Sequence, residues 1–279
     1  VDEFMDTLVG GRIQDAIDVD ATGLGLEIYA NRERRYLYLS ADSENPRVHV
    51  VDDKLRRGLP KPTQLGLLFR RYVENGIVTH ISQPSWERIM HIDVEGEEGD
   101  VTIIIEPMAR RANVLLVQNG IILDCIKRVG PEDNRYRLSL PNHEYVVPPP
   151  ITGQMNPADV TSDDIYNLLE RVEKKSAQTR RALTGQILGM SPLIAREIVF
   201  RATGDTNTKV RDTHADALYE AFLAVFSPLL NREWQTGIGQ EDGVISAFSP
   251  YPMESLDWQP TDTMSAAITA FNGSIVGPD

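Results

Sequence analysis

The chain has almost no cysteine. Among its 279 residues only Cys125 carries a thiol, and it lies within an apolar, strand-like run. A lone thiol forms no intrachain disulfide and no thiolate metal site, so the sequence excludes a disulfide-stapled fold. The chain also lacks any apolar run near the roughly 20 residues that cross a bilayer, and no basic and then apolar leader opens it. These absences predict a cytoplasmic protein with no membrane partner.

Motifs of catalysis and of metal binding are missing too. None of the five histidines has another histidine four residues away, so no helical His pair predicts a metal site. No serine-hydrolase, metalloprotease or cysteine-histidine motif is present, and the glycine-bearing segment 237–243 lacks the Lys-Ser/Thr ending of a phosphate-binding loop. The sequence therefore predicts no enzyme, no metal and no cofactor.

Positive charge is in short supply. The 28 Lys and Arg residues face 41 Asp and Glu residues, for a net charge of −13. The residues up to Pro150 hold 18 basic and 24 acidic side chains (18 − 24 = −6), and the rest hold 10 and 17 (10 − 17 = −7). A general nucleic-acid binder is basic overall, so this balance excludes one. Any polyanion site must be a local patch on an acidic body; the alternative is that the cations are plain solvated surface.

The segment 86–129 is the organising part of the chain. It holds three apolar runs, at 103–105, 114–117 and 121–126. The last two are joined through Asn119-Gly120, and both residues tolerate the positive φ angles of a tight hairpin turn. The segment therefore predicts four consecutive antiparallel strands.

Two basic pairs lie in this segment. Arg110-Arg111 opens one predicted strand, and Lys127-Arg128 closes the next. A hairpin would bring these four cations to one end of a sheet, which indicates a polyanion partner.

Further elements are predicted on either side. The chain opens at Val1 inside a predicted helix, so we expect residues upstream of Val1. Alternating apolar residues predict strands at 12–19, 24–30, 34–40, 47–51 and 77–83, and a helix that Thr63 N-caps and that stops at Gly76. At Pro148-Pro149-Pro150 the strand series ends, because consecutive prolines continue neither a strand ladder nor a helix.

Beyond these prolines the apolar period is that of helices. We predict helices from Thr161, at 180–188, from Ser191 to Gly204, at 213–226 and at 263–271, with a turn at 237–243 and a strand at 244–248. The helices within 180–204 are joined by Gly189, Met190 and Ser191, a helix-hairpin-helix pattern. Its free N–H groups and positive helix dipole suit a phosphate, and the alternative is a plain packed helix pair.

Nine motifs give the chain a resemblance to a known family. They are LVGGRIQ at 8–14, LEIYANRERRYLYLSA at 26–41, RVHV at 47–50, QPSWERI at 83–89, EPMARRANVLLV at 106–117, ILDCIKRV at 122–129, YVVPPP at 145–150, LGMSPLIAREI at 188–198 and FSPYPM at 248–253. On these motifs the chain resembles the N-terminal region of the NFACT proteins, a ribosome-associated quality-control family also described as fibronectin-binding protein A-like.

The resemblance implies an α+β fold. A β-rich domain at 1–150, like the N-terminal domain of formamidopyrimidine-DNA glycosylases, precedes a helix-hairpin-helix domain at 151–235. Residues 236–279 then supply a C-terminal strand and a short helix that return to the N-terminal domain. Family members continue into a coiled coil and an RNA-binding domain, so we expect this chain to be a fragment.

The resemblance also implies a function. The family binds the large ribosomal subunit that still carries peptidyl-tRNA after a stall, and it recruits tRNA to add a C-terminal alanine tail. Because the ribosome performs the peptidyl transfer, the chain itself is not expected to be an enzyme. The expected partners are tRNA and this subunit.

The family's site residues carry over with changes. Its Asp-Arg pair falls on Glu87-Arg88, with the acid changed and its charge kept; the alternative for this pair is a surface ion pair at a strand start. Its Met-Gly-Arg-His-Ser-Asn motif is Met108 to Asn113 here, with Arg111 in place of the histidine. These departures bear on tRNA selectivity more than on fold. The expected tRNA contacts are Glu87, Arg88, Arg110, Arg111, Asn113, Lys127 and Arg128, and the expected phosphate-binding hairpin is Gly189, Met190 and Ser191.

Two other functions compete with this one. The implied architecture also suggests a DNA glycosylase, but Val1-Asp2 supplies neither the proline nor the glutamate of that chemistry, and one cysteine builds no zinc finger. The older family description suggests a surface adhesin that binds fibronectin. No signal peptide or anchor is in view in this sequence, but the residues that we expect upstream of Val1 keep this alternative open. DNA and fibronectin are therefore the less favoured partners.

Overall fold

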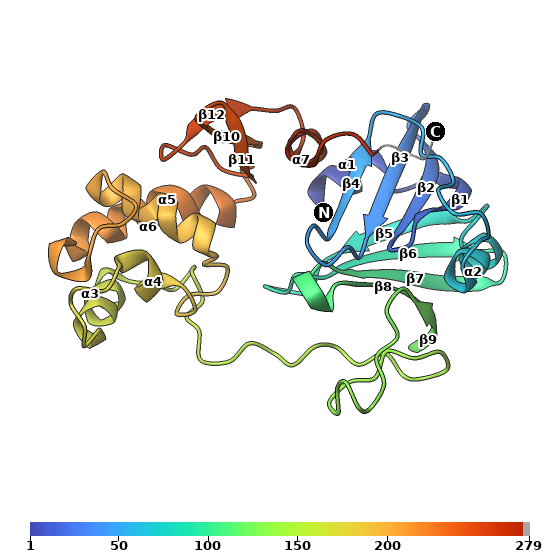
Figure 1. Ribbon diagram of the computed structural model, residues 1–279, viewed down its shortest axis with the longest axis horizontal. Helices are drawn as coiled ribbons and strands as arrows, with labels where there is room; N and C mark the ends of the chain where they lie inside the picture. The colour runs from blue at the N-terminus through green and yellow to red at the C-terminus, as the bar shows by residue number, and fades with distance from the viewer. Residues whose placement is uncertain (276–279) are drawn as a thin grey trace. The chain divides into compact units, whose positions relative to one another are not determined.

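The computed structural model describes residues 1–275 in two compact units (Figure 1). The first unit comprises Val1–Pro149 together with the residues from Asn272, and the second comprises Pro150–Phe271. The boundary falls at the run of prolines, whose missing N–H groups and fixed φ prevent regular structure from crossing it. None of the helices formed by the described residues is long and apolar enough to cross a membrane.

A nine-stranded antiparallel sheet forms most of the first unit, with the order β4-β3-β2-β1-β5-β6-β7-β8-β9. Its strands are β1 (Arg12–Asp20), β2 (Gly23–Ala30), β3 (Glu33–Ser40), β4 (Arg47–Val51), β5 (Ile77–Ser82), β6 (Met90–Gly96), β7 (Gly99–Glu106), β8 (Asn113–Gln118) and β9 (Ile121–Cys125). The helices α1 (Asp2–Thr7), α2 (Gln64–Tyr72) and the 3-10 helix η1 (Ala109–Arg111) complete the unit. Every strand predicted before the prolines is confirmed.

The four strands predicted in segment 86–129 are β6 to β9, each antiparallel to the next. In the turn between β8 and β9, Asn119 has a φ of 51° and Gly120 a φ of 76°. These left-handed values are those of the predicted tight hairpin turn, which favours asparagine and glycine.

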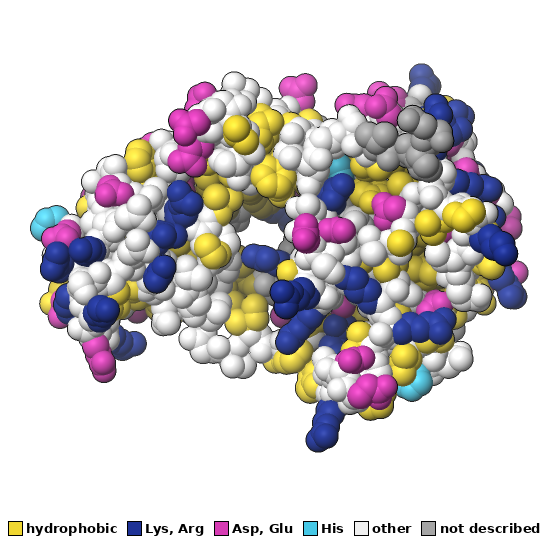
Figure 2. All heavy atoms as spheres, viewed as in Figure 1, with side chains coloured by type: hydrophobic (Ala, Val, Ile, Leu, Met, Phe, Trp, Pro, Cys, Tyr) yellow, Lys and Arg dark blue, Asp and Glu magenta, His cyan; other side chains and the backbone are white. Residues whose placement is uncertain are grey.

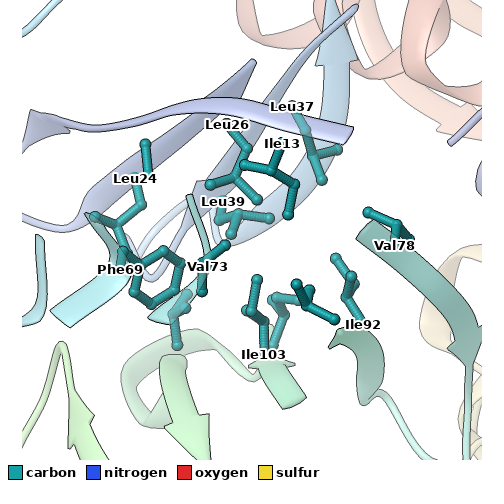
Figure 3. Packing of buried hydrophobic residues seen from close by; sticks show 14 of the residues in the cluster. Ile13, Leu24, Leu26, Leu37, Leu39, Phe69, Val73, Val78, Ile92 and Ile103 are labelled. Atoms are coloured by element: carbon teal, nitrogen blue, oxygen red, sulfur yellow. The ribbon is translucent and has the colours of Figure 1, made fainter. Parts of the chain in front are cut away.

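The sheet folds back on itself around a shared apolar core (Figure 3). Only Arg12 and Ile77 pair β1 with β5, so the sheet bends between these strands. Leu26 and Leu37 from one half point toward Ile103 from the other. Full burial of each such side chain stabilises the fold by about 1.5–3 kcal/mol, so this core is the main source of stability in the unit.

Strand β7 is buried on both faces. Ile103 and Ile105 point into the shared core, whereas Ile104 lies in a second apolar cluster with Leu115 on the opposite face. The long segment after β9 covers that face, and its Tyr145 packs against the second cluster. Three consecutive isoleucines therefore suit a strand that has no solvent-facing side.

Helix α2 starts over a buried carboxylate. The Thr63 hydroxyl accepts a hydrogen bond from Gly66 N at 2.9 Å, as expected of the predicted N-cap. Thr63 in turn donates its N–H (3.1 Å) and its hydroxyl (2.6 Å) to the Asp18 carboxylate. A Cβ on Gly66 would lie 2.1 Å from Asp18 Oδ2, so glycine is required here by close approach.

The second unit combines helices with a small sheet. It contains α3 (Ser162–Arg171), α4 (Thr179–Leu183), α5 (Pro192–Thr203), η2 (Val210–Asp212) and α6 (Ala215–Leu230), followed by β10 (Gly237–Glu241), β11 (Val244–Ser249), β12 (Asp257–Pro260) and α7 (Met264–Asn272). Thr161 and Asp164 form the predicted capping box, with Thr161 N donating to Asp164 Oδ2 at 2.9 Å. Ser191 caps α5 as predicted.

One predicted helix is shorter than expected and another is longer. The helix expected at 180–188 ends at Leu183, because Gly185 adopts a left-handed φ of 84° that no α-helix contains. Helix α6 extends past the predicted end at 226, through Pro228, to Leu230. A proline in the last turn removes only one N–H from the helical ladder, so the turn survives.

The C-terminal part of the chain differs most from the prediction. Residues 237–243, expected as a turn, form strand β10 up to Glu241. The expected separate segment 236–279 shares its core with the helices instead, since Ala247 and Met253 pack in the same apolar cluster as Phe222. Only the residues from Asn272 belong with the first unit.

A buried glutamate joins the small sheet to helix α5. Glu197 is fully buried and pairs with Arg201 Nε at 3.0 Å. Its carboxylate also accepts hydrogen bonds from Glu254 N (2.6 Å) and from Ser255 N (3.2 Å), in the connection between β11 and β12. Arg201 donates to Pro252 O at 2.6 Å. Every oxygen of this carboxylate is therefore paired, as a buried charge requires.

Candidate nucleic-acid interface

Strand register brings the predicted contacts of the first unit to one end of its sheet. Met90 is paired with Ile105, and Ile105 with Val114. One position further along, Glu106 is paired with Asn113. The turn before β6, the helix η1 and the end of β9 therefore lie at the same end. We call this region, with Arg88, Arg110, Arg111, Lys127 and Arg128, the cationic sheet end.

The turn before β6 presents Arg88. Glu87 N donates to Pro84 O at 3.1 Å, and Trp86, at the corner, has a left-handed φ of 62°. Gln83 Nε2 donates to Glu87 O at 2.7 Å, and this hydrogen bond stabilises the turn. Arg88 is exposed and Glu87 half-buried, and neither forms an ion pair with any described residue. The alternative of a surface ion pair is thus not what the structure shows.

Arg110 and Arg111 stand on η1 between β7 and β8. Both side chains are exposed, and neither forms an ion pair within residues 1–275. Ala109 opens the helix at a left-handed φ of 47°, which turns the chain away from the strand direction. An uncompensated arginine on a short, tight turn is well placed to meet a phosphate with its planar fork of donors.

Asn113 positions Lys127 at this end of the sheet. Its side chain is 4% exposed, so it does not reach a ligand directly. Its Nδ2 donates to Lys127 O at 2.8 Å, and its Oδ1 accepts from Lys127 N at 2.9 Å. Asn113 therefore fixes both backbone groups of Lys127, whose Nζ donates to Ser43 Oγ at 2.9 Å.

Arg128 is partly neutralised. Its Nε and Nη2 donate to the two oxygens of the Asp124 carboxylate at 3.2 Å and 3.1 Å. These hydrogen bonds raise the pKa of Arg128, and its side chain remains 54% exposed. In the cationic sheet end, Arg88, Arg110 and Arg111 therefore form no ion pair with a described residue. Arg128, in contrast, is paired with Asp124.

A buried charge network behind this end was missed by sequence reasoning. Glu106 is 1% exposed and accepts from Arg137 Nη1 and Nη2 at 3.0 Å and 2.7 Å. The Tyr145 hydroxyl also donates to Glu106, at 2.7 Å, and burial together with this carboxylate raises the pKa of Tyr145. A glutamate ending a buried isoleucine run was the one local signal. Its partners lie 31 and 39 residues away, where no local pattern points to them.

Cys125 is expected to react slowly with alkylating reagents, because its thiol is buried. Burial and the neighbouring Asp124 carboxylate raise the pKa of its thiol to about 12, so at pH 8 roughly one molecule in ten thousand carries the reactive thiolate. We expect iodoacetamide to alkylate the folded chain at least about a hundredfold more slowly than the chain in urea, as measured by mass spectrometry over time. Equal rates in both conditions would contradict this burial.

The predicted hairpin lies in the second unit. Gly189 is exposed with a φ of 77°, and Ser191 Oγ accepts from Ile194 N at 3.3 Å. Met190 is 5% exposed and packs in the apolar cluster of the unit. Its side chain is therefore part of the core, and only the backbone of the hairpin and Ser191 remain for a ligand.

Metal binding has no support in the described part of the chain. Within residues 1–275 no group of three or more His, Cys, Asp or Glu side chains is arranged to hold an ion.

Comparison with curated proteins finds relatives of this chain. Rqc2 homolog RqcH from Bacillus subtilis (strain 168) is 30% identical over 207 residues, which are 72% of this chain and 35% of that protein. Rqc2 homolog RqcH from Streptococcus pneumoniae serotype 2 is 32% identical over 180 residues, which are 62% of this chain and 32% of that protein. The chain thus spans about a third of the length of the curated relatives it matches.

Solved structures share the fold. The fibrinogen binding protein from Staphylococcus aureus superimposes with a TM-score of 0.75 at 23% identity, over 98% of this chain and 96% of that one. The N-terminal part of the fibronectin/fibrinogen-binding protein from Streptococcus suis gives 0.72 at 23% identity, over 96% and 94%. A family model described as NFACT N-terminal and middle domains matches residues 1–274. The chain therefore belongs to the NFACT family.

Proposed function

We propose that this chain is the tRNA- and large-subunit-binding module of a cytoplasmic quality-control factor, one that recognises stalled subunits carrying peptidyl-tRNA and recruits tRNA for C-terminal alanine tailing. The observation that carries the proposal is the cationic sheet end. Three arginines there, Arg88, Arg110 and Arg111, are exposed and have no ion-pair partner in residues 1–275, on a chain with a net charge of −13. Charge that the fold does not use is available to RNA phosphates.

The proposal gives the residues distinct parts. Arg88, Arg110 and Arg111 contact phosphates or base edges directly, and Glu87 accepts from a base amine beside Arg88. Lys127 and Arg128 add charge at the rim, while Asn113 positions Lys127.

The finer architecture belongs to the same proposal. We infer that the first unit is of the kind found at the N-terminus of formamidopyrimidine-DNA glycosylases and that 151–235 is a helix-hairpin-helix module. The hairpin of Gly189, Met190 and Ser191 then gives a second, backbone contact. The module performs no chemistry, because the ribosome carries out the peptidyl transfer.

Arg88→Ala tests the proposal. We expect the variant to bind tRNA about tenfold more weakly or worse, because a hydrogen bond to a charged group contributes about 1.5–3 kcal/mol. The thermal unfolding midpoint is expected to stay unchanged, since Arg88 is exposed and unpaired. Fluorescence anisotropy of labelled tRNA, at low and near-physiological salt, measures the affinity.

The matched control is Arg57→Ala, which removes an equally exposed arginine from another loop of the same unit. Unchanged tRNA affinity in Arg88→Ala, or an equal loss in both variants, would sink the part given to Arg88.

The same assay separates the competing functions. An abasic DNA duplex that is bound and cleaved would favour a glycosylase. Solved relatives carry fibronectin or fibrinogen in their descriptions, so an immobilised fibronectin fragment is the second arm. Binding to that fragment without tRNA binding would favour an adhesin.

A further inference from the structure

The positive charge of the second unit is concentrated in two short segments. Residues 171–181 hold five Lys and Arg residues and residues 209–211 hold two, which together are seven of the ten in Pro150–Phe271. Glu173 is the single acidic residue within these segments. We call the seven cations the basic patch, because they oppose the acidic balance of the rest of the unit.

Backbone hydrogen bonds hold the two segments together. Arg211 N donates to Lys175 O at 3.0 Å, and Gln178 forms an antiparallel bridge with Lys209. These hydrogen bonds fix the two segments next to each other, so the cations of the patch are held close together in the folded protein. Figure 2 shows dark blue Lys and Arg side chains at the end of the second unit that carries α3 and α4 in Figure 1.

Most of these cations form no ion pair with a described residue. Lys175 is used internally, since its Nζ donates to Leu169 O and Glu170 O at 2.9 Å each and so caps the end of α3. Arg211 lies 3.5 Å from Asp212, with both side chains exposed. The other five cations form no ion pair with any residue of the range 1–275.

Unused polar groups lie at the same place. The Nε of Arg180 and the Oε1 of Gln178 are both buried without a hydrogen-bond partner among the described residues. Buried polar groups in folded proteins nearly always have one. The patch therefore combines uncompensated charge with hydrogen-bonding capacity that the fold does not use.

We infer that the basic patch is a second RNA-docking surface, which takes the phosphate backbone of a folded RNA without reading its sequence. The inference rests on the proposed RNA-binding function and adds a site in the other unit, distinct from the cationic sheet end and from the hairpin. Lysines and arginines on a fixed frame position a backbone and carry no base information themselves.

The setting of the patch favours RNA over an acidic protein. The cations are flanked in the chain by Ser176, Asn207 and Thr208, small polar residues of the kind that contact phosphate and sugar. Protein interfaces are centred on buried aromatic anchors, and neither segment 171–181 nor segment 209–211 contains an aromatic residue. An acidic protein is kept as an outcome of the test.

The test removes three patch charges from the full chain. The patch variant is Lys174→Ala/Arg181→Ala/Lys209→Ala, and the matched control is Arg56→Ala/Arg57→Ala/Arg196→Ala, which removes the same charge from exposed positions elsewhere. Labelled tRNA and a short RNA duplex of unrelated sequence are titrated at several salt concentrations. Polyglutamate is the third probe, Arg88→Ala is run in parallel, and circular dichroism verifies that each variant is folded.

We expect the patch variant to bind both RNAs about tenfold more weakly or worse, and the slope of log affinity against log salt to fall by about 2–3. Each contact between a cation and a phosphate contributes close to 1 to that slope. The control is expected to keep the wild-type slope. Equal behaviour of patch and control variants, or a loss confined to polyglutamate binding, would overturn the inference.

The two proposals fail in different ways. Weaker tRNA binding by Arg88→Ala with an unaffected patch variant refutes the patch alone. A wild type that binds neither RNA refutes the proposed function and the patch together.

Discussion

Replacing Glu106 with alanine is expected to destabilise the first unit by about 3–5 kcal/mol. The change leaves the Arg137 guanidinium, whose side chain is 12% exposed, without the carboxylate that it meets at 3.0 Å and 2.7 Å. It also removes the acceptor of the Tyr145 hydroxyl. Urea unfolding followed by pulsed hydrogen exchange and mass spectrometry resolves the loss in peptides of the first unit.

The double variant sharpens this prediction. Glu106→Ala/Arg137→Ala removes both charges, so we expect it to lose less stability than the two single changes added together, because neither buried ion is left unpaired. Glu132→Ala is the matched control, since Glu132 is an exposed glutamate on the covering segment that also carries Arg137. A cost for Glu106→Ala no larger than that of Glu132→Ala would contradict the network.

Glu197→Ala is expected to cost the second unit a similar amount, about 3–5 kcal/mol. Arg201 would lose its ion pair, and the N–H groups of Glu254 and Ser255 would lose their acceptor. Because the carboxylate ties α5 to the connection between β11 and β12, we expect both elements to gain hydrogen exchange at the same urea concentration. Pulsed hydrogen exchange with mass spectrometry during urea unfolding measures this loss of protection in peptides of Pro150–Phe271.

Two results would separate local from general effects. Glu220→Ala, on an exposed position of α6, serves as the control and is expected to change stability by less than about 0.5 kcal/mol. If Glu197→Ala loosened α5 while β11 and β12 kept their protection, the carboxylate would not be what joins them.

Much of the first unit follows from local chemistry. Alternating apolar residues find the strands, because in an antiparallel sheet one face is in the core. Asn119-Gly120 gives the turn and Thr63 the start of α2, since each supplies a backbone conformation or an acceptor that few residues supply. The gathering of Arg110-Arg111 and Lys127-Arg128 at one end of the sheet was also predicted from the sequence, because the register at the turns is set within a few residues.

The features that could not be predicted from the sequence depend on contacts between segments that are far apart in the chain. Pro228 is tolerated because the helix is ending there, which the local pattern does not say. Residues 237–241 form a strand because β12 pairs with them from across a loop. Asn113, expected as a contact, turns inward because Lys127 offers it both backbone groups. Each of these outcomes requires knowing which segments meet in space.

The frame beneath the basic patch has a consequence for how such a module diversifies. Its two segments are joined through backbone atoms, and Lys174 and Lys209 face solvent without structural duty. Lys174 and Lys209 can therefore be replaced one at a time without loss of stability, and the RNA docking that we propose would change in small steps. The cationic sheet end is different: Glu106 and Asn113 hold it through their own side chains. In protein design, the cations of the basic patch could be substituted, whereas Glu106 and Asn113 would be kept.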